Sequence, residues 1–282
     1  QKTFVSSLMI SIFCFGNAIL SAILVIHYDL EIFGVAAGTT IAAYTAVIIF
    51  LIYSYFYLKN KLKISLTYKN IFNNKKLLKL FNINFDIFIR TILLTFSFLW
   101  VTYQSAKLGE NYLAVNTLLI QFIMLASFFL DAYAFSTEAV VGYTIGKRVK
   151  KSFLEVVTNA FQLSIFSGLL ISLIYLFTSR HIINELTDLD YIRFLSFNYI
   201  VWIVIIPPIA SICYQFDGIF IGASQTKEMR NGMIISVVLF ILSSQFLVNN
   251  FGNHGLWLSL SFFMIMRSIT LNYYFNRILK NF

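Results

Sequence analysis

The chain has 282 residues, of which 59% are hydrophobic and only 12% are charged, and its mean hydropathy is +0.80. This composition excludes a soluble globular domain, in which about 25% of residues are charged, and it predicts an all-α, polytopic bundle of membrane helices. The net charge of +9 does not indicate a nucleic-acid partner, because the basic residues gather in the loops between apolar runs.

Eight apolar runs follow one another along the chain, and each is long enough to cross a bilayer as a helix, which takes about 20 residues. They extend from Phe4 to His27, Gly34 to Leu58, Phe85 to Lys107, Leu113 to Tyr143, Phe153 to Phe177, Ile192 to Ile221, Met233 to Asn249 and Leu256 to Asn276. The sequence therefore predicts about eight transmembrane helices.

One long polar stretch, residues 59–84, interrupts these runs and is rich in lysine. We expect it to be a cytoplasmic linker between lobes. The layout of residues 1–58 is repeated by the last two runs, which suggests that 1–58 closes an N-terminal lobe and that 85–282 is a complete six-span C-terminal lobe. About four spans would then precede Gln1. The alternative, that any two apolar hairpins look alike, stays open on this evidence.

Charge alternates between successive loops. The linker and the stretch "GKRVKK" carry lysine and arginine, whereas the intervening loops carry half of the acids, namely Asp29, Glu31, Glu110, Glu185, Asp188 and Asp190. The positive-inside rule then predicts a multi-pass protein of the cell (inner or plasma) membrane with both chain ends in the cytoplasm.

Residues typical of enzyme or metal sites are sparse and scattered. Cys14 and Cys213 fall inside apolar runs, where they serve as small apolar residues, and His27, His181 and His254 each stand alone. No metal-ligand spacing, nucleophile-base arrangement or phosphate-binding glycine loop is present in the sequence. We expect no enzyme activity, no metal and no cofactor other than a coupling ion.

Asp217 is the sharpest candidate for function, because it follows Pro207 and Pro208 within one apolar run. The two prolines should kink or break the helix near mid-membrane, and broken helices at that depth line sites in transporters. A carboxyl group there could bind a proton or a cation. The alternative is a hydrated aspartate near the cytoplasmic end of the helix.

Asp131 and Glu138 are two more acids inside a run, and their spacing of seven places them on one helix face together with Ser127. Asp131 is the deeper, so it is the better candidate to bind a proton or cation. Glu138 is a second candidate for coupling, or it pairs with basic residues of the following loop.

Other polar residues within the runs are candidates to line a cavity: Arg90, Thr95, Asn116, Gln121, Tyr214 and Arg267. Asp86 and Arg90 are four residues apart and could pair with each other. Thr91, Thr95 and Thr102 lie close to one helix face. Their side chains either line a cavity or bond to their own backbone or to a neighbouring helix. Arg267 needs an acidic or carbonyl partner that the sequence does not identify.

Four stretches together resemble a known family: "NINFDIFIRTILL", "LAVNTLLIQFIMLASFFLDAYAFSTEAVVGYTIGKR", "FDGIFIGASQTKEMRNGM" and "FGNHGLWLSLSFFMIMRS". They are similar to the C-terminal lobe of multidrug and toxic compound extrusion (MATE) transporters, in the subgroup of the DNA-damage-inducible protein F-like members. The most specific parts are Asp131 to Gly146 and Asp217 to Asn231.

The resemblance implies spans five to twelve of a two-lobe transporter that exchanges organic cations and amphipathic compounds for protons or sodium ions. Asp217 matches a tenth-span aspartate that takes part in coupling in some members. Others use a first-span aspartate, which this chain does not contain, so the coupling ion stays open. The implied partners are small organic substrates and the bilayer, without nucleic acid, and the implied state is a monomer when full length.

Two alternatives to this efflux antiporter remain. A flippase for a lipid-linked or polysaccharide precursor should carry more cations for a pyrophosphate group than Arg90 and Arg267. A membrane-embedded transferase should show a catalytic cluster at a span end, and a non-transporting subunit is the other possibility of this class.

Overall fold

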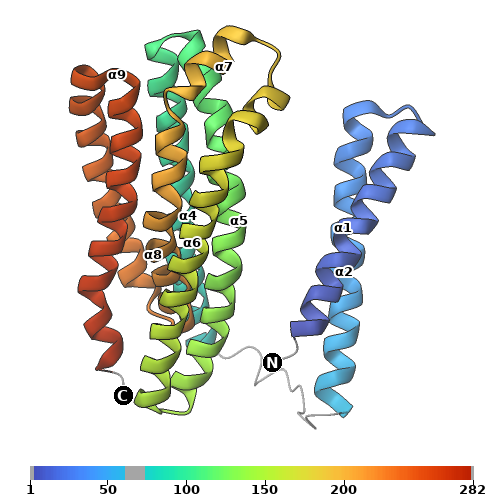
Figure 1. Ribbon diagram of the computed structural model, residues 1–282. Coiled ribbons are helices and arrows are strands. Elements are labelled where there is room, and N and C mark those ends of the chain that lie inside the picture. The colour runs from blue at the N-terminus through green and yellow to red at the C-terminus, as the bar shows by residue number, and fades with distance from the viewer. Residues whose placement is uncertain (1–2, 61–73, 281–282) are drawn as a thin grey trace. The chain divides into compact units, whose positions relative to one another are not determined.

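The computed structural model describes residues 3–60 and 74–280, which form two compact units, Gln1–Leu77 and Leu78–Phe282. All regular structure in these ranges is helical (Figure 1). The helices are α1 (Thr3–Ile26), α2 (Glu31–Asn60), α4 (Asn74–Leu108), α5 (Glu110–Gly146), α6 (Lys150–Leu186), α7 (Asp190–Phe197), α8 (Ile200–Gly222) and α9 (Thr226–Leu279). Seven helices of the described chain are long and apolar enough to span a membrane. The prediction of an all-α membrane bundle is confirmed.

The first unit is a hairpin of α1 and α2. A glycine is required where the helices meet, because a Cβ on Gly38 would lie 2.8 Å from the backbone nitrogen of Ser21. This close approach places Asn17 between the helices, where its Oδ1 accepts hydrogen bonds from Ser21 Oγ at 3.0 Å and Thr39 Oγ1 at 2.9 Å. Small residues and one amide thus join two otherwise apolar helices.

In the second unit, α8 packs against both α5 and α6. The contact with α5 relies on two glycines: a Cβ on Gly218 would lie 2.3 Å from the Ala134 carbonyl oxygen, and one on Gly222 would lie 2.5 Å from the Glu138 carbonyl oxygen. The spacing of four residues keeps both glycines on one helix face. Backbones at this distance bring Asp217, next to Gly218, up against α5.

Of the kink or break predicted at Pro207 and Pro208, a break is not found. Helix α8 runs through both prolines, and the chain is interrupted earlier, at Asn198 and Tyr199 between α7 and α8. Pro208 cannot donate to the carbonyl of Val204, but Ser172 Oγ on α6 donates to that oxygen at 2.5 Å. A neighbouring helix thus satisfies the freed carbonyl, as is common for prolines in membrane helices.

Helix α9 contains two antiparallel helices that turn at Gly252, whose φ of 56° and ψ of −133° are not helical (Figure 1). Its two arms contact each other along their length: the rings of Phe240 and Phe263 are 5.3 Å apart, and Arg277 Nη1 lies 3.0 Å from Glu228 Oε1. The predicted runs 233–249 and 256–276 correspond to these arms, so all eight predicted spans have a helical counterpart.

The predicted linker is only partly described. Residues 61–73 lie outside the described residues, and residues 74–84 belong to helix α4. Within the second unit, the end that carries Lys147, Arg148, Lys150 and Lys151 is called the basic end, and the end that carries Glu110, Glu185, Asp188 and Asp190 is called the acidic end. The assignment of the units to transporter lobes stays a prediction.

Candidate functional site

A cluster of charged side chains joins three helices inside the second unit. Asp217 on α8 accepts hydrogen bonds through Oδ2 from Arg267 Nη2 on α9, at 2.6 Å, and from Arg90 Nη2 on α4. The exposed fractions of the three side chains are 6% for Asp217, 1% for Arg267 and 16% for Arg90. Asp217 is therefore the partner of Arg267 that the sequence did not identify, and the hydrated alternative for Asp217 does not hold.

The cluster is electrically unbalanced and incompletely hydrogen-bonded. Two guanidinium groups share one carboxylate oxygen, while Asp217 Oδ1 and the Nε atoms of Arg90 and Arg267 are buried without a partner. Buried polar groups are nearly always satisfied, and each exception calls for an explanation. Open bonding capacity around a shared carboxylate allows the partners to be exchanged.

Beside this cluster lies a cavity of about 210 Å³, formed by α4, α5 and α8. It is lined by Arg90, Leu94, Thr95, Phe98, Ile123, Met124, Ser127, Asp131 and Tyr214. Thr95 is exposed and Tyr214 is buried, so the cavity extends from the surface of the unit to its interior.

Asp131 is the acid of this cavity, and it is half-buried. Within residues 3–60 and 74–280 it makes no hydrogen bond or ion pair, unlike Asp217. With both acids ionised, the charges of Arg90, Arg267, Asp217 and Asp131 sum to zero. Neutralising either carboxyl would leave these four groups with one excess positive charge.

The structure brings together six of the predicted site residues and separates the other three. Arg90, Thr95, Asp131 and Tyr214 line the cavity, and Arg267 is linked to it through Asp217. Glu138 lies two turns further along α5, partly buried, and neither lines the cavity nor pairs with a basic residue of the described chain.

Asn116 and Gln121 do not line this cavity. Asn116 is about 22 Å along the axis of α5 from Asp131 at 1.5 Å per residue, and it is buried in a polar network. Its Oδ1 accepts from Trp257 Nε1 at 2.9 Å, and its Nδ2 donates to Asn253 Oδ1 at 2.6 Å. Gln121 is exposed on another face of α5. Asn116 is thus too far along the helix axis to line this cavity, and Gln121 lies on the wrong side of the helix.

The expected pair of Asp86 and Arg90 is also wrong. Asp86 Oδ1 accepts from Arg230 Nη1 at 2.6 Å and Oδ2 accepts from Thr226 Oγ1 at 3.2 Å, while Arg90 binds Asp217. Each side chain meets a partner on another helix, where desolvation makes a charged pair stronger than an exposed pair along one helix.

The role of Arg230 was missed, because it lies in the short polar stretch "SQTKEMRNG" between two apolar runs, where it looks like an ordinary loop cation. The three threonines predicted to share one face of α4 do not all have the same role. Thr91 and Thr102 donate to the carbonyls four residues before them, at 2.9 and 3.1 Å, and only Thr95 lines the cavity.

No group of three or more His, Cys, Asp or Glu residues that could hold a metal ion occurs in the described part of the chain.

Comparison with known proteins places this arrangement in context. The MatE family model matches residues 87–247, which is more than half of the chain. The chain is 35% identical over 257 residues to DNA damage-inducible protein F of Escherichia coli, an alignment covering 90% of this chain and 55% of that protein. It is 25% identical to the multidrug export protein MepA of Staphylococcus aureus, over 82% of this chain and 51% of that protein.

Solved structures share the fold. The Vibrio cholerae MATE transporter VcmN in its bent form superposes with a TM-score of 0.84 at 18% identity, over 99% of this chain and 63% of that one. At this identity the likeness concerns the fold alone. The chain spans about half the length of the curated relatives it matches.

Proposed function

The chain belongs to the MATE family of membrane transporters, and we propose that it forms part of a secondary active efflux transporter. The proposed activity is export of drug-like or other amphipathic organic compounds by antiport with a cation, by a monomer with both chain ends in the cytoplasm. The observation that carries the proposal is the half-buried, unpaired Asp131 in a cavity next to Asp217, which two arginines hold. Support also comes from the relative named as a multidrug export protein.

The charges around the cavity favour a proton over a sodium ion. A metal cation at Asp131 would lie near two guanidinium groups that already occupy Asp217 Oδ2, and repulsion at short range in a poorly solvated site is strong. A proton binds one carboxyl oxygen covalently and needs no shell of oxygen ligands. We therefore propose that Asp131 takes up the proton first.

Proton uptake by Asp131 would then act on Asp217 and its arginines. Neutral Asp131 leaves the cluster with one excess positive charge, which weakens the hold on Arg90, the guanidinium that lines the cavity and is the more exposed of the two. Because Arg90 is on α4, Asp217 on α8 and Arg267 on α9, a change of partner shifts the relative stability of two helix arrangements. Ion binding is thereby coupled to alternating access.

The flippase alternative receives less support. A pyrophosphate group needs unpaired cations, and both arginines of the cluster share Asp217. The transferase alternative receives no support from a metal site, because no group of three or more His, Cys, Asp or Glu residues that could hold a metal ion occurs among the described residues.

The proposal is tested with the full-length protein reconstituted in proteoliposomes with a fluorescent organic cation inside or outside. An imposed pH gradient alone should drive movement of the dye against its gradient, and a sodium gradient at equal pH should not. Movement driven only by sodium would contradict the assignment of the proton. Failure of both gradients, with protein correctly inserted, would contradict antiport of organic cations altogether.

A further inference from the structure

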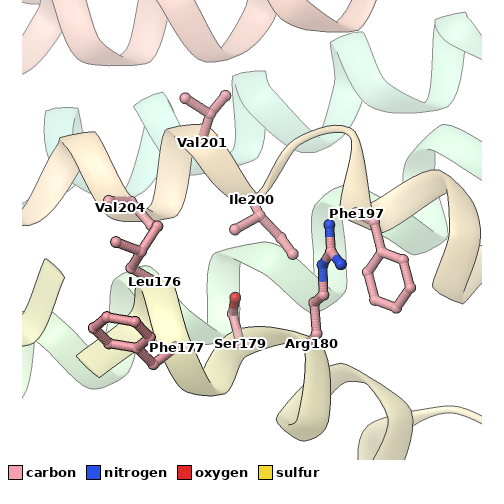
Figure 2. Close-up of a pocket in the computed structure, with 8 residues that line it drawn as sticks. All are labelled: Leu176, Phe177, Ser179, Arg180, Phe197, Ile200, Val201 and Val204. Atoms are coloured by element: carbon pink, nitrogen blue, oxygen red, sulfur yellow. The ribbon is translucent and has the colours of Figure 1, made fainter. Parts of the chain in front are cut away.

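A second pocket, of about 450 Å³, lies near the acidic end of the second unit, between α6 and the segment that joins α7 to α8 (Figure 2). Leu176 and Phe177 on α6 and Val204 on α8 give it an apolar wall, and Ser179, Arg180 and Phe197 lie toward its other side. Leu176 and Phe177 are 58% and 76% exposed, so the pocket opens on the outer surface of membrane-spanning helices. The medium at such a surface is lipid.

Arg180 supplies a cation to this pocket that no acid of the described residues neutralises. Its guanidinium carbon lies 5.4 Å from the centroid of the Phe197 ring, and it forms no ion pair with the described residues. The nearby acids Asp190 and Asp188 instead form ion pairs with Arg193, at 3.1 Å and 3.4 Å. Figure 2 shows the guanidinium group between Phe197 and Ile200, both of which line the pocket.

Ser179 supplies an unused hydroxyl at the same place. Its side chain is completely buried, lines the pocket, and makes no hydrogen bond with any described residue. Two nearby hydroxyl groups on α6 are satisfied: Thr178 donates to the Ile174 carbonyl at 2.8 Å and Ser172 donates to the Val204 carbonyl. A buried hydroxyl without a partner costs about 1 to 3 kcal/mol, which a ligand oxygen can offset.

We propose that this pocket binds one glycerophospholipid, with its phosphate on Arg180 and an acyl chain along Leu176 and Val204. Arginine is well suited to phosphate because its planar guanidinium donates two parallel hydrogen bonds. The position also fits, since Arg180 is six residues, or about 9 Å, from the end of α6, at the depth where arginines extend toward lipid headgroups. The apolar wall then runs from the phosphate toward the membrane interior, as an acyl chain does.

The test measures binding of the first lipid to purified full-length protein in detergent by native mass spectrometry, with phosphatidylethanolamine and diacylglycerol as probes. Arg180→Gln should weaken phosphatidylethanolamine binding about tenfold, as expected for loss of a charge-assisted hydrogen bond, and should leave diacylglycerol binding unchanged. Leu176→Trp, which fills the apolar wall at an exposed position, should weaken binding of both.

Lys107→Gln is the matched control, because Lys107 is also a cation over an aromatic ring, 4.5 Å from the Tyr103 centroid, near the acidic end but outside this pocket. It should bind both lipids as the wild type does, and thermal unfolding should show that all variants are folded. Equal phosphatidylethanolamine binding by Arg180→Gln and the wild type would overturn the proposal. So would an equal loss in Lys107→Gln, which would show only a general attraction to charge.

Discussion

Asp86 and Arg90 are one turn apart on α4, yet they belong to two clusters of different character. At the basic end, each carboxylate oxygen of Asp86 has one donor, Arg230 for Oδ1 and Thr226 for Oδ2. In the cluster of Asp217, Arg90 and Arg267, the two arginines share Oδ2 of Asp217, and its Oδ1 has no donor among the described residues. A carboxylate whose two oxygens both have a donor holds one arrangement of helices. A carboxylate with an unbonded oxygen can change partners. We infer that the first stabilises the fold and the second carries the transport cycle.

The largest effect is expected from Asp217→Asn in the full-length protein. The substitution leaves Arg90 and Arg267 as two buried cations without their shared carboxylate, and breaking a buried pair in this way costs about 3 to 5 kcal/mol. Efflux of a fluorescent organic cation driven by an ion gradient should fall to the level of empty vesicles, while the protein still inserts in the membrane.

Loss of folding is separated from loss of transport by a second variant. Arg90→Gln combined with Asp217→Asn restores the charge balance of the cluster and should recover part of the thermal stability without recovering efflux, because only Arg267 is then left as a buried cation without its carboxylate. Asp188→Asn, on a fully exposed aspartate at the acidic end, is the matched control and should behave as wild type. Undiminished efflux by Asp217→Asn would remove Asp217 from the mechanism.

A smaller change in stability but a clear loss of coupling is expected from Asp131→Asn. Asp131 has no partner in the described chain, so the free energy of unfolding should change by about 1 kcal/mol or less. Coupling free energies are typically about 1 to 3 kcal/mol, so the gradient-driven rate should fall by about 5- to 150-fold. Vesicles with a pH gradient measure the rate, and thermal unfolding in detergent measures the stability.

Glu138→Gln is the control within the same helix, because Glu138 is partly buried on α5 but does not line the cavity. Its efflux rate should stay near that of the wild type. If Asp131→Asn and Glu138→Gln lose transport equally, the cavity has no special part in coupling, and the difference proposed between these two acids is wrong.

The sequence predicted what depends on local pattern and missed what depends on packing. Hydropathy located every span, and the spacing of Asp131 and Glu138 placed them correctly on one helix. The sequence could not predict partners on different helices. Asp86 was paired with Arg90 because helical spacing describes only neighbours on the same helix. The expected break at Pro207 and Pro208 failed for the same reason, since the donor that compensates for Pro208, Ser172, lies on α6.

The smallest effect on transport, and a distinct effect on stability, is expected from Asp86→Asn. An amide keeps an acceptor for Thr226 but loses the charge that holds Arg230, so the free energy of unfolding should fall by about 1 to 3 kcal/mol. Because Arg230 is 24% exposed, water can solvate it after the change, unlike Arg267. Efflux per folded molecule should therefore remain, with an unchanged dependence on the pH gradient. A loss of coupling as complete as that of Asp217→Asn, in protein that unfolds at the wild-type temperature, would mean that the basic-end pair also changes partners during transport.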